Sequence, residues 1–281
     1  MSMNKVRALA CTMATTAMLA VPIATVAPIV ATTPAMAATC GNNASGFNAW
    51  KQSFAKEAAG KGIKKRGLQA LEGAQYATKT IAADRNQKSF KYSLEKFMQV
   101  RGANTIVSQG KSKKKADARF FANMEAKYGV PAGPLLAIHG METGFGRFTG
   151  NTNMVSAAAT LAYDCRRSEF FTGHLLAALK LVDRGVINSN TRGAAHAELG
   201  HTQFLAGNVL KYGVDGDGNG RLDLNNKYDA LASTANFLRA HGWRKGGGYQ
   251  KGEVNYRAIQ GWNAAGVYQQ AIAIMAKQID G

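Results

Sequence analysis

One apolar stretch in the middle of the chain limits what the rest can fold into. Residues 130–141 begin with two prolines, Pro131 and Pro134, which a first helical turn tolerates, and continue with leucine, isoleucine and methionine at helical spacing. This pattern predicts a largely buried helix, so other elements must surround it. Glu142 stands at its end, directly before a glycine-rich turn, in the sequence AIHGMETGFG (137–146).

Two roles are open for Glu142. A carboxyl group on a buried helix loses hydration, which disfavours its charged form and can keep it protonated near neutral pH, as a general acid requires. Perturbed carboxyl groups also occur in purely structural networks, and a glutamate at a helix end can simply lie in solvent. The residues alone leave both the catalytic and the structural role possible.

The spacing of the other apolar residues predicts a mainly α-helical fold. They recur chiefly at intervals of three and four, and we expect helices at residues 45–59, 66–74, 92–100, 116–128, 130–141, 155–162, 167–184, 205–212, 228–241 and 263–279. Only residues 246–254, with three glycines and Tyr249, suggest a small β-hairpin. Residues 193–204 (GAAHAELGHTQF) mix polar residues with glycine and are expected to line a cleft.

The N-terminal residues 1–37 have the pattern of a secretory signal peptide. Lys5 and Arg7 precede a long stretch without charge, which ends in Ala35-Met36-Ala37. An uncleaved membrane anchor is the alternative, because the stretch is long enough to span a bilayer. Its prolines and the A-x-A site favour cleavage, so we expect residues 38–281 to be exported to the periplasm as a soluble chain without stable membrane insertion.

Two cysteines remain in the expected mature chain, because Cys11 lies in the signal. In an exported protein, Cys40 and Cys165 favour a disulfide. Two unpaired buried thiols are the alternative. Lipidation of Cys40 is a further one, which the preceding Thr39 disfavours. The bond would join the N-terminal segment to the region just after the central stretch.

The chain is strongly basic. It has 35 Lys and Arg residues against 17 Asp and Glu, a net charge of +18, and only two of the basic residues lie in the predicted signal. Such a charge favours a polyanionic partner. Nucleic acid is one candidate, but export favours an anionic envelope polymer or a membrane surface, and a merely solvated basic face stays possible. We expect the densest run, KSKKK (111–115), to be the exposed side of a helix.

The segment DGDGNG (215–220) resembles the first half of an EF-hand calcium loop. Oxygen-bearing side chains alternate with glycine, and a glycine stands at the sixth position, where the loop turns sharply. Position twelve is Asn226 instead of the usual Glu, and Asp229 is the nearest carboxylate that could close the site. We expect a structural Ca²⁺ and no organic cofactor; a turn without metal is the alternative.

Other catalytic patterns are absent from the sequence. His196 and His201 flank Glu198, but their interval of five does not fit the H-E-x-x-H helix of zinc proteases. No G-x-S-x-G motif occurs, and a disulfide would leave no cysteine nucleophile. Several aromatic residues could stack on sugar rings, although most such residues belong to a core: Trp50, Trp243, Trp262, Tyr249, Tyr256 and Tyr268.

Four blocks, in this order, resemble the MltB-type lytic murein transglycosylases of the lysozyme-like superfamily: AKYGVPAGPLLAIHGMETGFGRFTGNT, AATLAYDCRRSEFF, GAAHAELGHTQFLAGNVLKYGVDGDGNGRLDL and LASTANFLRAHGW. The resemblance extends over residues 47–279. It implies a lysozyme-like α-helical core with an inserted EF-hand-like calcium loop. We expect an N-terminal helical lobe (38–130) and a catalytic core (131–281) that contains the loop (215–229).

The resemblance also implies an activity. Members of this family cleave the β-1,4 bond between N-acetylmuramic acid and N-acetylglucosamine in peptidoglycan without water and form a 1,6-anhydro ring. The expected partner is the glycan strand, bound by a monomer, and not nucleic acid. Two alternatives remain: a lysozyme-like hydrolase, with Glu198, Asp164 or Glu169 as a second carboxylate, and a peptidoglycan-binding envelope protein with little or no activity.

Site residues follow from the family's motifs. Glu142 matches the single catalytic acid and base, and Gln203 matches a glycan contact. Further substrate contacts are expected at Phe204, Tyr256, Asn263 and Tyr268. The calcium ligands implied are Asp215, Asp217, Asn219, Arg221 through its carbonyl, and Asp229. The chain departs from the family near the expected glycan contacts, with Ala206, Gly207, Val209 and Ala265 where the pattern has Pro, Ser, Tyr and Ser.

Overall fold

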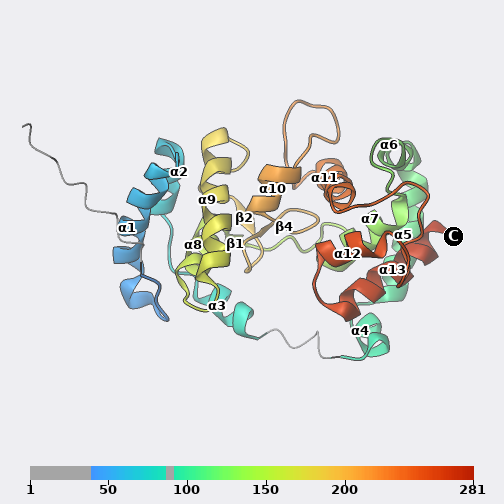
Figure 1. Cartoon of the computed structure of the whole chain (residues 1–281), viewed down its shortest axis with the longest axis horizontal. Coiled ribbons are helices and arrows are strands. Elements are labelled where there is room, and N and C mark those ends of the chain that lie inside the picture. Colours follow the sequence, from blue (N-terminus) through green and yellow to red (C-terminus); the bar gives the residue numbers. More distant parts are fainter. Residues whose placement is uncertain (1–38, 87–91) are drawn as a thin grey trace, which may run out of the picture. The chain divides into compact units, whose positions relative to one another are not determined.

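The structure, a computed structural model, describes residues 39–86 and 92–281. These residues form thirteen α-helices, one short 3-10 helix and two antiparallel pairs of two-residue strands (Figure 1). The prediction of a mainly α-helical fold is confirmed. The predicted signal peptide lies outside the described residues. None of the helices in the described ranges has the length and apolar character that a membrane span requires.

The elements follow one another along the chain as η1 (Ala44–Gly46), α1 (Phe47–Gly60), α2 (Lys65–Glu72), α3 (Thr78–Arg85), α4 (Leu94–Val100), α5 (Ala103–Ala116), α6 (Ala118–Tyr128), α7 (Ala132–Thr143), β1 (Thr152–Asn153), α8 (Met154–Tyr163), α9 (Ser168–Arg184), β2 (Arg192–Gly193), β3 (Glu198–Leu199), β4 (Phe204–Leu205), α10 (Ala206–Tyr212), α11 (Lys227–Ala240), α12 (Tyr256–Trp262) and α13 (Gly266–Asp280). Strand β1 pairs with β2, and β3 pairs with β4.

Helix α7 is the central stretch, and it is buried as the sequence predicts. It packs against α5, α6, α11 and α13 (Figure 1). Eleven of its twelve residues are buried, and Glu142 is the exception. Glu142 is therefore the one residue of α7 that keeps partial exposure.

Two glycines allow the neighbours of α7 to approach closely. A Cβ added to Gly133 would lie 2.3 Å from the carbonyl oxygen of Ala276 on α13. One added to Gly140 would lie 2.4 Å from Cγ2 of Ile106 on α5. Glycine weakens a helix by about 0.5–1 kcal/mol relative to alanine, and here that cost is offset by tighter helix packing.

A second group of helices packs around α8 and α9. Helix α2 lies against both, and α1 contacts α2 and α8. Stacked rings of Phe47, Trp50 and Phe54 form the inner face of α1. Before α1, Cys40 is joined to Cys165, so the predicted disulfide is confirmed and the N-terminal segment is fixed beside the end of α8.

The predicted hairpin over residues 246–254 is wrong. This segment consists of turns, and the strands lie elsewhere, between residues 152 and 205. The buried side chain of Asn255 supplies the hydrogen bonds that a strand ladder would have made. It accepts from the Arg244 amide (2.7 Å) and donates to the carbonyls of Arg244 and Gly247 (both 2.8 Å).

The sequence prediction missed α3 and α12, and of α5 it placed only the lysine run (111–115) in a helix. Helix α5 buries only Ala103, Ile106 and Gly110, so its core face carries too few apolar side chains to be read as periodic. The lysine run forms the end of this helix, and its side chains differ in exposure. Lys111 and Lys115 are exposed as predicted, whereas Lys114 donates to the carbonyl of Asp280 at 2.7 Å. The proposed division into two lobes stays a prediction.

Candidate active site

The Glu142 carboxyl is held by two residues far along the chain. The hydroxyl of Tyr268 on α13 donates to Oε1 at 2.6 Å, and the indole Nε1 of Trp262 donates to the same atom at 3.0 Å. The other oxygen, Oε2, accepts no hydrogen bond from the described residues and is not among their fully enclosed unpaired atoms. One oxygen is therefore fixed by the protein, and the other is available to a ligand.

Burial raises the pKa of Glu142 above its ordinary value. The hydrogen bonds from Tyr268 and Trp262 and the positive charge of Arg101 act in the opposite direction, because each favours the carboxylate. The group is thus able both to hold a proton and to exist as a stabilised anion after losing it. Acid and base roles in one reaction require both states.

Trp262 was not assigned to the site from the sequence. It ends α12, and its ring packs edge-on against Phe204 of β4, with ring centroids 5.3 Å apart, and against Phe237 of α11 at 5.1 Å. Trp262 was among the aromatic residues considered for sugar stacking, but such residues are equally typical of a core, and no sequence signal connects this one to Glu142. Its contact with Glu142 depends on how α12 packs against α11 and α13.

Glu198 on β3 is a second acidic group near Glu142. Burial, together with the negative charge of Glu142, raises the pKa of Glu198 to about 8, and Arg167 opposes the shift. At pH 7 this carboxyl group is therefore mostly neutral. Asp164 forms an ion pair with Arg85 at 2.6 Å, and Glu169 is exposed in the first turn of α9. Of the three second carboxylates considered from sequence, Glu198 is the one whose charge interacts with Glu142.

Backbone strain is concentrated around these groups. Among the described residues, three that are not glycine have a positive φ: Phe145 (64°), Ala197 (61°) and Gln203 (55°). They lie three residues after Glu142, directly before Glu198, and directly before Phe204. Such conformations cost about 1–3 kcal/mol each and persist where the surrounding structure enforces them, often at functional sites.

Polar contacts connect the turn between β3 and β4 to the end of α7. The Thr143 hydroxyl donates to the His201 carbonyl at 2.7 Å, and the imidazoles of His139 and His201 share a hydrogen bond of 2.9 Å. Burial and the neighbouring His201 lower the pKa of His139 to about 3, so His139 is neutral near pH 7. The Gln203 amide donates to the Gly200 carbonyl at 2.9 Å. These contacts fix the turn beside Glu142.

The structure brings some of the expected substrate contacts together. Tyr268 touches Glu142 directly, and Phe204 reaches it through Trp262. Asn263 follows Trp262 and accepts from the Ala265 amide at 2.9 Å. Tyr256 is buried at the start of α12. Tyr268 and Phe204 are also buried, so they support the site from behind more than they offer surface to a ligand.

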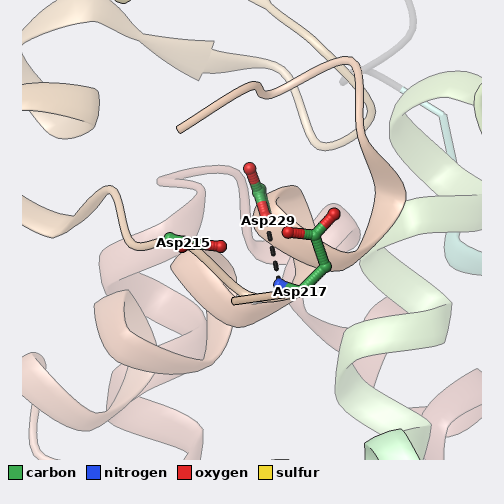
Figure 2. Close-up of side chains that lie close together, drawn as sticks. All are labelled: Asp215, Asp217 and Asp229. Carbon is green, nitrogen blue, oxygen red and sulfur yellow. Dashed lines mark hydrogen bonds between the residues drawn. The ribbon is translucent and has the colours of Figure 1, made fainter. Parts of the chain in front are cut away.

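The acidic loop holds a separate cluster of carboxylates. Asp215 and Asp217, which lie between α10 and α11, and Asp229 of α11 each have one oxygen within 4.8 Å of the others, and the three side chains lie close together (Figure 2). Asp229, in the first turn of α11, is fully buried and accepts from the amides of Gly216 (2.8 Å) and Asp223 (2.8 Å). No ion pair involves these three residues within the described ranges. A convergent, uncompensated set of hard oxygens suits Ca²⁺.

Asn226, at position twelve of the loop where an EF-hand has glutamate, forms a helix cap. Its side chain caps α11 by accepting from the Tyr228 amide at 2.9 Å. The cap starts the helix at Lys227 and so places Asp229 back toward the loop. The residues present therefore fit a cation, with Asp229 as the closing carboxylate.

Known proteins resemble the chain in both sequence and fold. Residues 46–252 match the family model described as "Transglycosylase SLT domain". Membrane-bound lytic murein transglycosylase B of Escherichia coli K12 is 38% identical over 121 residues, which are 42% of this chain but only 34% of that protein. The aligned part thus spans about a third of that relative.

Two solved structures show the same fold. SltB3 of Pseudomonas aeruginosa, in complex with NAG-NAM-pentapeptide, has a TM-score of 0.76 at 30% identity, over 84% of this chain and 80% of that chain. Slt35 of Escherichia coli, in complex with calcium, has a TM-score of 0.73 at 21% identity, over 86% of this chain and 96% of that chain.

Proposed function

This chain belongs to the transglycosylase SLT domain family, and from that membership we propose that it cleaves the glycan strands of peptidoglycan as a lytic transglycosylase. One observation carries the proposal: Glu142 is the one residue of the otherwise buried helix α7 that keeps partial exposure, with Oε1 held by Tyr268 and Trp262 and Oε2 without a hydrogen bond from the described residues. The resemblance in its motifs and the pentapeptide ligands of SltB3 support peptidoglycan as the substrate class.

Glu142 acts first as an acid. Its carboxyl group, kept protonated by burial, donates through Oε2 to the glycosidic oxygen as the bond to C1 of N-acetylmuramic acid breaks. N-acetylglucosamine leaves with a new hydroxyl group. The acetamido oxygen of the substrate attacks C1 and stabilises the positive charge there, so no second carboxylate is required.

Glu142 acts next as a base. As a carboxylate stabilised by Tyr268 and Trp262, it takes the proton of the C6 hydroxyl of the same sugar. The C6 oxygen then attacks C1 and displaces the acetamido oxygen, which closes the 1,6-anhydro ring and returns the proton to Glu142. Water takes no part in this sequence.

Mass spectrometry of digested murein tests the chemistry. Anhydro-muramic ends are expected on every new product end. Reducing muramic ends, which carry the mass of one water more, would show a hydrolase instead.

A lysozyme-like hydrolase is the second candidate, because Glu198 lies close enough to Glu142 for the two charges to interact. A hydrolase would need Glu198 as an anion, either as nucleophile or as base. Its pKa of about 8 keeps it mostly neutral at pH 7, which favours the transglycosylase. If hydrolysis does occur, the reducing ends should disappear in Glu198→Gln while Glu142→Gln loses all cleavage.

A non-catalytic peptidoglycan-binding protein is the remaining alternative. Glu142→Gln keeps the shape of the side chain and the two hydrogen bonds to Oε1 but cannot give up a proton. The native chain should clear murein suspensions and the variant should not. Equal clearance by both would favour the binding protein.

We also propose that the loop of Asp215, Asp217, Asn219, Arg221 and Asp229 binds one structural Ca²⁺. The supporting observation is the converging carboxylates of the loop. Saturating Ca²⁺ should raise the melting temperature over that in EDTA. At a free Ca²⁺ concentration of a hundred times Kd, the binding adds about 2.7 kcal/mol to the free energy of unfolding. Asp217→Asn, at an exposed position, should remove this gain. The same melting temperature with Ca²⁺ and with EDTA would exclude the site.

Export as a periplasmic protein is part of the proposal. The Cys40 sulfur is engaged in the disulfide, so it is not free to carry a thioether-linked lipid. N-terminal sequencing of the chain secreted by its host should begin at Ala38. A chain that keeps residues 1–37 would be anchored instead.

A further inference from the structure

A cavity lined by three arginines lies apart from the catalytic carboxyl group. It has a volume of about 740 Å³, and its charged lining is Arg66, Arg184, Arg221 and Asp223. None of Glu142, Trp262, Tyr268 or Gln203 lines it. Leu199 of β3 lines the cavity, whereas its neighbour Glu198 interacts with Glu142. Because successive strand residues point to opposite faces, the cavity lies on the other side of β3 from the catalytic site.

The arginines of the cavity have no acceptor of their own. Within the described residues, no hydrogen bond or ion pair of their guanidinium groups occurs. The nearest carboxylate in sequence, Asp183, is used otherwise: it accepts from the backbone amides of Lys64 and Gly67, both at 2.7 Å. Asp223 accepts from the Asn225 amide at 2.9 Å. The charged lining thus has three arginines and a single aspartate, which is itself hydrogen-bonded.

The backbone that carries these arginines is held in place. The two bonds to Asp183 fix the start of α2 on either side of Arg66. Arg66 lies across Gly185, where a Cβ would be 3.5 Å from its guanidinium nitrogen. The Arg221 amide donates to Asn219 at 2.8 Å. The three arginines therefore come from three segments: the start of α2, the end of α9 and the acidic loop.

The rest of the lining limits the chemistry of a ligand. Apolar side chains of Val186, Ile187, Leu199, Val209, Leu222 and Leu224 form much of the wall. A second cavity of about 190 Å³ shares Arg66 and Asn188 with the first. A bare inorganic anion would use neither the apolar wall nor the extension. A ligand with apolar side chains and at least two separated oxyanions would use all of these features.

We propose that this cavity binds a short acidic peptide, whose carboxylates pair with Arg66, Arg184 and Arg221 while its apolar side chains cover the wall. Arginine suits this role because its planar group makes paired hydrogen bonds with a carboxylate. The proposal does not depend on the lytic activity. If the chain does act on peptidoglycan, the peptide stems of that polymer are ligands of this class.

Calorimetric titration of the full chain tests the proposal with three probes. Acetyl-Ala-Glu-Ala has two carboxylates and apolar side chains, acetyl-Ala-Gln-Ala-amide has the same shape without charge, and sodium pyrophosphate has charge without apolar groups. We expect binding of the acidic peptide that weakens with salt, no measurable binding of the neutral one, and weaker binding of pyrophosphate.

Variants locate the binding. We expect a roughly tenfold higher Kd for the acidic peptide in each of three variants at exposed positions: Arg66→Gln, Arg184→Gln and Arg221→Gln. The control is Arg257→Gln, an exposed arginine of α12 that does not line the cavity; it should bind as the native chain does. Glu142→Gln should also bind normally, so a loss of activity and a loss of this site are distinguishable.

Several results would overturn the proposal. One is unchanged affinity in all three cavity variants. Another is equal binding of the neutral peptide. Binding of pyrophosphate at least as tight as that of the peptide would make the cavity an inorganic anion site. No binding of the peptide up to about 10 mM, a limit of roughly 2.7 kcal/mol, would leave no peptide site there.

Discussion

At the scale of single residues, Tyr268 controls what Glu142 can do after it loses its proton. The Tyr268 hydroxyl donates to Oε1 at 2.6 Å, and this bond favours the charged form of the carboxyl group. Removal of the bond in Tyr268→Phe should raise the pKa of Glu142 further. The alkaline limb of kcat/KM, which marks deprotonation of the acid, should therefore move to higher pH.

The same variant should lower kcat by about 10- to 100-fold, since a hydrogen bond to a charged group contributes about 1.5–3 kcal/mol. Tyr163→Phe, which removes a buried hydroxyl near the disulfide, is the matched control. A pH profile of Tyr268→Phe that coincides with the native profile would show that the hydroxyl has no part in the proton transfers.

Glu198 interacts with Glu142 by charge, since the Glu142 carboxylate helps to raise the pKa of Glu198 to about 8. Glu142 therefore loses its proton while Glu198 is still mostly neutral. Glu198→Gln, which is neutral too, should leave the alkaline limb of the activity profile close to that of the native chain, as should the control Glu169→Gln, exposed on α9. A limb that moves to lower pH in Glu198→Gln alone would show that Glu198 is an anion when Glu142 loses its proton.

Glu198 should also make stability depend on pH. Its pKa is raised from 4.5 to about 8 in the folded chain, so the folded state keeps a proton that the unfolded state loses within this range. The native chain should therefore lose stability as pH rises from 4.5 to 8, by at most about 1.4 kcal/mol per pH unit. Melting curves of Glu198→Gln should be flatter over the same range, and a slope equal to the native one would contradict the raised pKa.

At the scale of elements, the contact between α7 and α13 positions Tyr268 relative to Glu142. Gly133 sets the separation of these helices, because its Cβ position is 2.3 Å from the Ala276 carbonyl. Gly133→Ala must push the helices apart and should cost about 1–3 kcal/mol of unfolding free energy. It should also lower activity, since the Tyr268 hydroxyl would move away from Oε1.

Gly173 provides the control for this prediction. It lies within α9, and a Cβ there meets nothing within 4 Å. Gly173→Ala should therefore stabilise the chain by about 0.5–1 kcal/mol. Denaturant unfolding of both variants separates the two effects by sign. A neutral Gly133→Ala would mean that the helices adapt without cost.

At the scale of the whole molecule, the disulfide links residues 125 positions apart in sequence. Closing so long a loop restricts the unfolded chain, which gives a stabilisation of about 4–5 kcal/mol in the chain-entropy account. The double variant Cys40→Ser/Cys165→Ser should lose about 2–5 kcal/mol in denaturant unfolding.

Activity at 25 °C should survive in this variant, because the bond lies beside α1 and α8 and not at Glu142. Loss of activity without loss of folded structure, judged by circular dichroism, would show that the N-terminal segment acts on the site directly.

The extent of the sequence prediction differs between fold and site. The spacing of apolar residues was sufficient to predict α7, α8, α9 and α11, because these helices have many apolar residues at helical intervals. It failed for α5, whose core face includes Gly110 against Ile279, because glycine carries no hydrophobic signal. It also failed at residues 246–254, where Asn255 replaces strand pairing with side-chain hydrogen bonds.

The sequence by itself determined the central helix, the acid at its end and the acidic loop, because each depends on residues that are near neighbours in the chain. Only the tertiary structure decided what surrounds that acid. Trp262 and Tyr268 lie 120 and 126 residues from Glu142, and the three arginines of the second cavity come from α2, α9 and the loop. The burial and the electrostatic environment of a site depend on residues that are distant in sequence and meet only when the chain packs, so the local spacing of residues does not predict them.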